Sequence, residues 1–248
     1  MPLPPVFDSW DCKRPALLPR SRLYALEPIG VGTSFVESLT GYVGRLAEAH
    51  TVSVGDLVGR ELSAATSKPL GLHSNRHRAG FHGFHAQGHV IDGFGGIAKT
   101  WVHALEKATS QRNLRFLTLL PFEGVFSLEG AFRRTRAWCP ACYQEWQRPG
   151  EIVYEPLLWA MRLVTICPKH HRPLEKNCPC CRRPLVPLAV FSRPGYCSTC
   201  GKSLESSERR DFSEDDGIRS PEILDARSGT PRPSGNCSLL PSVQTPRP

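Results

Sequence analysis

The sequence predicts a mainly α-helical protein that carries two small cysteine-rich modules in its C-terminal half. Between residues 35 and 120, apolar side chains recur every three or four positions, which is the period of an amphipathic helix. Eight of the ten cysteines lie between residues 139 and 200. From about Glu205 the chain is rich in Ser, Pro and charged residues, with Phe212 as the one aromatic, so we expect a disordered tail.

Two helix starts are encoded near the N-terminus. Ser34 and Glu37 form a capping-box pattern, which predicts a helix over residues 35–50. Ser53 and Asp56 repeat the pattern and predict a second, short helix. Two helices joined by a three-residue turn are typical of a helix-turn-helix.

Three further helices are expected. One begins at Ile97, another is capped by Asn113 and ended by Pro121, and the last spans residues 156–164. Residues 66–96 interrupt this pattern with seven glycines and five histidines. A histidine-rich metal site is one interpretation of that segment, but the histidine spacings favour a glycine-rich loop that is solvated or contacts a partner.

The cysteines and one histidine form four short motifs, each with two residues between its potential ligands. The pairs are Cys139 with Cys142, Cys167 with His170, Cys178 with Cys181, and Cys197 with Cys200. Such spacing lets one tight turn present both donors to a tetrahedral ion. The last two pairs enclose 15 residues, as in four-cysteine zinc sites, and the first two enclose 24. We therefore expect two structural zinc ions, and the fold class is mainly α with small zinc-stabilised modules.

Other interpretations of these motifs are weaker. Disulfides are disfavoured because residues 1–5 do not resemble an apolar targeting core, and we expect a cytoplasmic protein. His171 competes with His170, but the two-residue spacing favours His170. Cys12, Cys180 and Cys237 are expected to be bystanders. A catalytic zinc would keep one position open and no HExxH or HxE motif is present, so we expect no enzyme.

The chain is basic, with a formal net charge of +8, and it has no apolar run of transmembrane length. Residues 139–204 hold nine Lys and Arg against four Asp and Glu, and two thiolate-bound zinc ions would lower that +5 to about +2. Five arginines are candidates for contact with nucleic acid or a protein partner, and the alternative is that they form a solvated face. These candidates are Arg45, Arg60, Arg133, Arg134 and Arg136.

Three tryptophans flank or enter the cysteine-rich region. Trp138, Trp146 and Trp159 are expected to pack over the metal sites, with base stacking as the alternative. Together these patterns divide the chain into a helical domain with the helix-turn-helix (15–137), a double zinc-finger module (138–204) and a disordered low-complexity tail (205–248).

Several of these segments resemble the TniQ/TnsD family of transposition proteins. The likeness is carried by residues 35–46, by the helix from Trp101 to Glu106, and by the framework from Arg134 to Cys142 and from Cys167 to His170. It covers about residues 15–204. The resemblance implies an N-terminal helix-turn-helix followed by two zinc-finger motifs.

The resemblance also implies a function without chemistry of its own. Such proteins act in target-site selection, joining a target-recognising element to the AAA+ ATPase that recruits the transposase. The recognising element is DNA or an RNA-guided CRISPR effector. A stand-alone DNA-binding regulator is the alternative, but Asp56 and Glu61 on the second predicted helix would repel phosphate, which favours protein contact.

Overall fold

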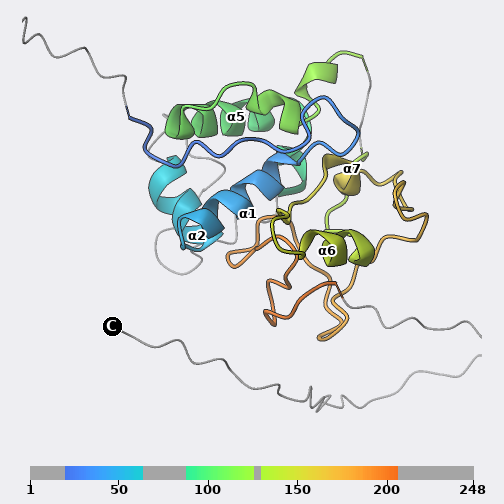
Figure 1. Ribbon diagram of the computed structural model, residues 1–248. Coiled ribbons are helices and arrows are strands. Elements are labelled where there is room, and N and C mark those ends of the chain that lie inside the picture. Colours follow the sequence, from blue (N-terminus) through green and yellow to red (C-terminus); the bar gives the residue numbers. More distant parts are fainter. Residues whose placement is uncertain (1–19, 64–87, 126–129, 206–248) are drawn as a thin grey trace, which may run out of the picture.

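The computed structural model describes residues 20–63, 88–125 and 130–205 (Figure 1). Within these ranges the protein is helical, and its extended segments form isolated bridges rather than a sheet. The N-terminal residues 1–19, most of the glycine- and histidine-rich segment, and the tail after Glu205 lie outside the described residues. The predicted helical fold class is confirmed for the part of the chain that the structure describes.

The first helix, α1, spans Leu39–Ala49 and begins later than expected. Its N-cap is Ser38, whose Oγ accepts a hydrogen bond from the backbone N–H of Gly41 at 3.0 Å. The predicted capping box at Ser34 is wrong because Glu37 is engaged elsewhere. The Glu37 carboxylate is completely buried and accepts hydrogen bonds from the Arg45 guanidinium at 2.8 and 2.9 Å.

The second predicted helix start is confirmed. Ser53 Oγ accepts from the backbone N–H of Asp56 at 3.0 Å and donates to the Asp56 carboxylate at 2.6 Å. This cap opens α2 (Val54–Asp56), which continues without a break into the π-helical segment η1 (Leu57–Leu62). The turn before it contains Thr51 in the left-handed conformation, at φ 55°. Together α1, the turn and α2–η1 form the predicted helix pair.

The helix predicted to begin at Ile97 is present, whereas the helix predicted between Asn113 and Pro121 is replaced by two short turns. Helix α5 spans Gly96–Thr109 and buries Trp101 and Leu105. After it, Asn113 takes a left-handed conformation and does not cap a helix with its side chain. Two short 3₁₀ turns follow, η2 (Leu114–Leu117) and η3 (Leu120–Phe122), separated by the extended Thr118 and by Leu119.

The C-terminal half contains two short helices, α6 (Pro140–Trp146) and α7 (Leu157–Ala160). The sequence did not predict α6, and the helix expected over 156–164 ends at Ala160. It ends there because the chain turns to pair with an earlier segment: Arg162 N–H donates to the Ala131 carbonyl at 2.7 Å, and Met161 forms a bridge with Phe132.

The protein has two clusters of buried apolar side chains. The first lies between α1, α2–η1 and α5, and the second surrounds the cysteines. Figure 1 shows α5 on one side of α1, and α6 with the orange C-terminal loops on the other. The halves are joined through the backbone, since Ser38 N–H donates to the Glu155 carbonyl and Leu157 N–H to the Val36 carbonyl, both at 2.8 Å.

Asp92 stabilises the start of α1 from a distant part of the chain. Its carboxylate accepts hydrogen bonds from the Thr40 backbone N–H at 2.8 Å and from the Thr40 hydroxyl at 2.7 Å. The N–H groups of a first helical turn lack intrahelical partners, and a carboxylate there also interacts favourably with the helix dipole. Burial nevertheless raises the pKa of Asp92 from 3.8 to about 7, although the Thr40 donors oppose the shift.

We expect this buried carboxyl group to give the protein a distinctive pH dependence. Because the folded-state pKa of Asp92 lies above the unfolded value, its contribution to stability is fully present below pH 3.8 and is lost as the pH rises through about 7. The free energy of unfolding should therefore fall by about 2 kcal/mol between about pH 5.5 and 7.5. Asp92→Asn should flatten this slope in urea titrations. A slope that persists unchanged in the variant would contradict the assignment.

Candidate metal centres

The first cluster contains Cys139, Cys142, Cys167 and His170, whose ligand atoms all lie within 4.8 Å of one another. The Sγ atoms of Cys142 and Cys167 are 3.7 Å apart, and His170 Nδ1 lies 3.3 to 3.7 Å from the three sulfurs. Zn–S bonds of about 2.3 Å and Zn–N bonds of about 2.0 Å give tetrahedral edges of about 3.8 Å and about 3.5 Å. The cluster therefore has the size and donor set of a tetrahedral metal centre.

The second cluster contains Cys178, Cys181, Cys197 and Cys200, again with all four sulfurs within 4.8 Å of one another. The Sγ–Sγ distances are 3.7 Å between Cys178 and Cys200 and 3.7 Å between Cys181 and Cys197. A disulfide would require about 2.05 Å. No disulfide joins the cysteines of the described ranges. The spacing fits four thiolates around one ion.

Three of the four motifs are built by the same backbone turn. In each, the backbone carbonyl of the first cysteine accepts a hydrogen bond from the N–H of the residue four positions later. The N–H of the same cysteine donates to the carbonyl of the residue five positions later. These bonds are 2.8 to 3.0 Å long at Cys167, Cys178 and Cys197. The fourth residue is left-handed in each turn: His171 (φ 51°), Arg182 (φ 59°) and Gly201 (φ 70°). The repeat brings both donors of each motif to one side of the turn.

The remaining motif uses a helix start instead. Cys139 is the N-cap of α6, Pro140 occupies the first turn and Cys142 follows within it. A hydrogen bond from the Cys142 thiol, aided by the backbone N–H groups of Cys142 and Ala141, lowers the pKa of Cys139 to about 5. This shift favours the thiolate form of Cys139, which is the form that binds metal.

The second cluster also stabilises a thiolate. Burial raises the pKa of Cys197, but hydrogen bonds from the backbone N–H groups of Cys200 and Thr199, together with those from the Cys200 and Cys178 thiols, lower the value to about 7. These N–H groups lie 3.5 and 3.4 Å from Cys197 Sγ, respectively. Each cluster thus contains one cysteine whose pKa is lowered by its hydrogen-bond donors.

His170, and not its neighbour His171, takes the fourth position of the first cluster. Nδ1 of His170 faces the sulfurs, while its Nε2 lies 2.8 Å from Glu145 Oε1. Lys169 pairs with the other Glu145 oxygen. The hydrogen bonds from Lys169 and then His170 lower the pKa of Glu145. A carboxylate that accepts from Nε2–H fixes the tautomer in which Nδ1 is free to bind metal.

Glu145, which lies 2.8 Å from His170, was not among the residues expected at the first cluster. It lies three residues after Cys142 on α6, and residues with this spacing share one face of a helix. The sequence feature that could have predicted its position is therefore a carboxylate one helical turn after a cysteine of the cluster.

We expect Glu145→Ala to weaken metal binding at the first cluster by about 10- to 100-fold, because His170 loses the group that orients its ring. Affinity can be measured by competition with a chromophoric chelator, and the second cluster should keep its affinity. The exposed Glu151 provides a control on the same module, and Glu151→Ala should have no effect. Equal losses in the two variants would show that Glu145 has no specific role.

Of the other three cysteines, Cys180 lies in the described part of the chain and does not join either cluster. Cys180 lies in the third motif and packs against the apolar residues around the second cluster, but it is not one of the four donors. Cys12 and Cys237 lie outside the described residues.

The tryptophans form the core of the cysteine-rich half. Trp138, Trp146 and Trp159 are exposed by 1, 8 and 2 %. Trp146 stacks on Tyr154 with ring centroids 4.4 Å apart, and Trp159 meets the edge of Tyr143 at 5.5 Å. These buried rings cannot stack on bases, so that alternative is wrong and the packing role is confirmed.

Two of the five candidate contact arginines are structural. The Arg45 side chain is 11 % exposed and pairs with the buried Glu37. The Arg136 side chain is 4 % exposed, pairs with Glu155 and donates to the Tyr196 carbonyl at 3.3 Å. The expected contact role is corrected for both, because their charges are satisfied inside the protein.

The other three arginines are more accessible. Arg60 is 80 % exposed and lies 3.5 Å from the carboxylate of Asp56 on the same helix. Arg134 is exposed, and Arg133 is half-buried. Arg133 and Arg134 lie together at the junction of the two halves, whereas Arg60 lies on the helix pair.

The helix pair is covered by a loop of the second cysteine module, residues 187–194. Gly55 N–H at the start of α2 donates to the Val190 carbonyl at 3.3 Å. Arg193 pairs with Glu48 of α1 at 2.6 Å, and Leu188 is part of the helical core. The first turn of the second helix, which would carry base-reading residues in a DNA-binding helix-turn-helix, therefore lies against the protein's own loop.

The family comparison agrees with this architecture. The model of the TniQ family matches residues 28–174, more than half of the chain. The chain belongs to the TniQ family. No match was found among curated proteins. The matched region contains α1 to α7 and all donors of the first cluster, whereas the second cluster lies beyond it.

Membership identifies the general role of this TniQ protein as a transposition-associated accessory protein. The TniQ domain is an accessory domain of transposition rather than a catalytic one. No helix in the described ranges is long and apolar enough to cross a membrane.

Proposed function

We propose that this TniQ protein is a cytoplasmic, non-catalytic adaptor in transposon target-site selection. It links a target-recognition element to the AAA+ ATPase of the transposon. The recognition element is a CRISPR effector or another target recogniser, and DNA is contacted as part of the complex. The observation that carries the proposal is the covered helix pair, since Gly55 in the first turn of α2 donates its backbone N–H to the Val190 carbonyl of the protein's own loop.

The exposed part of α2–η1 also favours an adaptor over a reader of DNA sequence. Gly59 and Arg60 are exposed, and Asp56 and Glu61 lie beside them. Two carboxylates next to one arginine give little attraction for phosphate and few donors for base edges.

The two clusters are proposed to bind structural zinc, with the ligand sets given above. A Cys₃His and a Cys₄ set of tetrahedral size suit Zn²⁺, and neither set leaves a position for water. In this proposal the ions hold a helical domain (15–137) and a double zinc-finger module (138–204) in their folded forms. Elemental analysis of protein purified without added metal tests the identity of the ions.

The adaptor proposal is tested by co-purification of the tagged, zinc-loaded protein with the AAA+ ATPase encoded in the same element, in the presence of ATP and duplex DNA. We expect the ATPase to be retained. An AAA+ ATPase from an unrelated element serves as the specificity control and should not be retained.

The same experiment distinguishes the alternative. Retention of duplex DNA without the ATPase would favour a stand-alone zinc-containing DNA-binding regulator. In cells, deletion of the gene should abolish transposition while purified transposase keeps its strand-transfer activity, and unchanged transposition would refute the adaptor role.

A further inference from the structure

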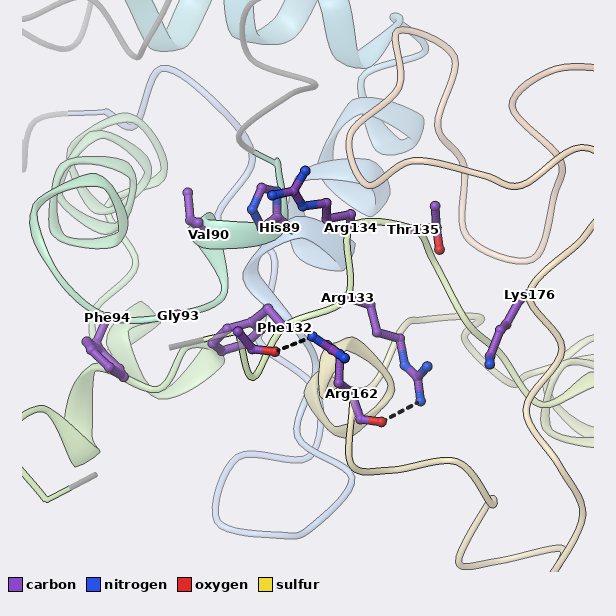
Figure 2. A pocket seen from close by; sticks show the side chains of 11 residues that line it. His89, Val90, Gly93, Phe94, Phe132, Arg133, Arg134, Thr135, Arg162 and Lys176 are labelled. Atoms are coloured by element: carbon purple, nitrogen blue, oxygen red, sulfur yellow. Dashed lines mark hydrogen bonds between the residues drawn. The ribbon is translucent and has the colours of Figure 1, made fainter. Parts of the chain in front are cut away.

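A basic cavity lies where the helical half meets the cysteine-rich half (Figure 2). Its volume is about 650 Å³. One wall is formed by residues 89–94, which begin within the helical turn at 88–91, and the other by residues 130–135 with Arg162 and Lys176. This cavity is separate from both metal clusters and from the covered helix pair.

The charges that line the cavity have one sign. Arg133, Arg134, Arg162 and Lys176 contribute four cations, and no carboxylate lies among the described lining residues. Arg134, Arg162 and Lys176 are exposed. A concave surface lined by like charges concentrates its field on ligands of opposite charge. The cavity is therefore suited to an anion.

The arginines are held close together by the backbone. Arg162 donates from Nη1 to the Gly130 carbonyl at 3.3 Å, and Arg133 donates from Nη2 to the Arg162 carbonyl at 3.3 Å (Figure 2). Nε of Arg133 is buried without a hydrogen-bond partner. Burial, and then the charge of Arg162, lower the pKa of Arg133. This repulsion would be relieved by an anionic ligand.

Two aromatic rings complete the cavity. Phe94 and Phe132 are both half-buried and line it. The Phe132 ring packs on Gly93, where an added Cβ would lie 3.2 Å from a ring carbon. Figure 2 shows the two rings toward one end of the cavity and Lys176 at the other, with Arg133 and Arg162 between them.

We propose that this cavity binds a segment of single-stranded nucleic acid, with backbone phosphates at Arg134 and Lys176 and a base against Phe94. Positive charge that follows the backbone, combined with aromatic rings for bases, is the usual composition of single-strand sites. The volume falls within the range of about 300 to 1,000 Å³ that holds small ligands, enough for a nucleotide unit. A duplex keeps its bases stacked inside and cannot place one against Phe94. The proposal does not depend on the adaptor role.

The test measures binding of a fluorescein-labelled oligothymidylate of about 16 nucleotides to the purified, zinc-loaded protein by anisotropy. The double variant Arg134→Glu/Lys176→Glu should weaken binding by about tenfold or more. The slope of the logarithm of the binding constant against the logarithm of the salt concentration should become shallower by about 1.4, because two phosphate contacts are lost. The matched control Lys107→Glu/Arg148→Glu makes the same change in net charge at exposed positions away from the cavity. It should weaken binding by less than about threefold.

A second variant tests the aromatic contact. Phe94→Ala should weaken binding of the single strand by about tenfold and leave duplex binding unchanged. Metal content and thermal stability report whether each variant is folded. Equal losses in the cavity and control variants would overturn the proposal, as would duplex binding equal to single-strand binding. Competition by polyglutamate as effective as by unlabelled oligothymidylate would overturn it in favour of an acidic peptide. Since the assay contains no ATPase, its failure leaves the adaptor proposal to its own test.

Discussion

Cys178→Ser is expected to release one of two metal ions and to unfold the second cysteine module. The four thiols of this module lie within 4.8 Å of one another, and only short turns and a few apolar side chains surround them. Structural zinc contributes on the order of 10 kcal/mol in isolated fingers, which exceeds the total stability of many domains. Elemental analysis should find one ion per chain, and thermal unfolding should begin at a much lower temperature.

The neighbouring Cys180 provides the matched control. It lies in the same motif but is not one of the four donors. Cys180→Ser should keep both ions and nearly all of the thermal stability. If Cys178→Ser also kept two ions, the second cluster would not be a metal centre. Cys139→Ser should have the corresponding effect on the first cluster.

Glu155→Gln is expected to destabilise the protein by about 3 to 5 kcal/mol, because it leaves the buried Arg136 charge unpaired. The side chains of this ion pair are only 18 and 4 % exposed. Arg136 N–H also donates to the Leu185 carbonyl at 2.7 Å, while the Glu155 carbonyl accepts from Ser38 at the start of α1. The pair thus stands where the helical half meets both cysteine clusters. Urea titration of the zinc-loaded protein measures the effect.

A second ion pair across the same junction serves as the control. Glu48 and Arg193 are joined at 2.6 Å, but their side chains are 41 and 52 % exposed. Glu48→Gln should therefore cost less than about 1 kcal/mol. Replacing both buried partners, in Arg136→Met/Glu155→Met, should recover much of the loss, since no charge then remains unpaired. Equal costs for Glu155→Gln and Glu48→Gln would show that the buried pair is not specially important.

Features encoded by neighbouring residues could be predicted from the sequence. Ser53 caps the second helix because its partner Asp56 lies only three residues away. The metal donors are similarly local, since each motif forms within one turn and needs no knowledge of the rest of the fold. The pairing of motifs into two clusters followed from their order along the chain.

Features set by distant contacts could not be predicted in this way. Glu37 matches a capping box, but its ion pair with Arg45 and the bridge to Pro156 hold it in an extended segment before α1. The helix expected to reach residue 164 ends at Ala160 because residues 131–133 pair with the segment that follows. The buried roles of Arg136 and Asp92 likewise depend on partners that no sequence pattern reveals.

The loop at 187–194 has a consequence for the order in which the chain can fold during synthesis. Leu188 is 2 % exposed within the helical core, whose other members lie between residues 23 and 117. The core therefore stays incomplete until the ribosome has released a segment that lies between the donors of the second metal cluster. Contacts between such distant segments are slow to form. Leu188 lies between two donors of the second cluster, so metal binding there would fix the segment that carries it. The helical core, which is synthesised first, would thus be completed by the module that is synthesised last.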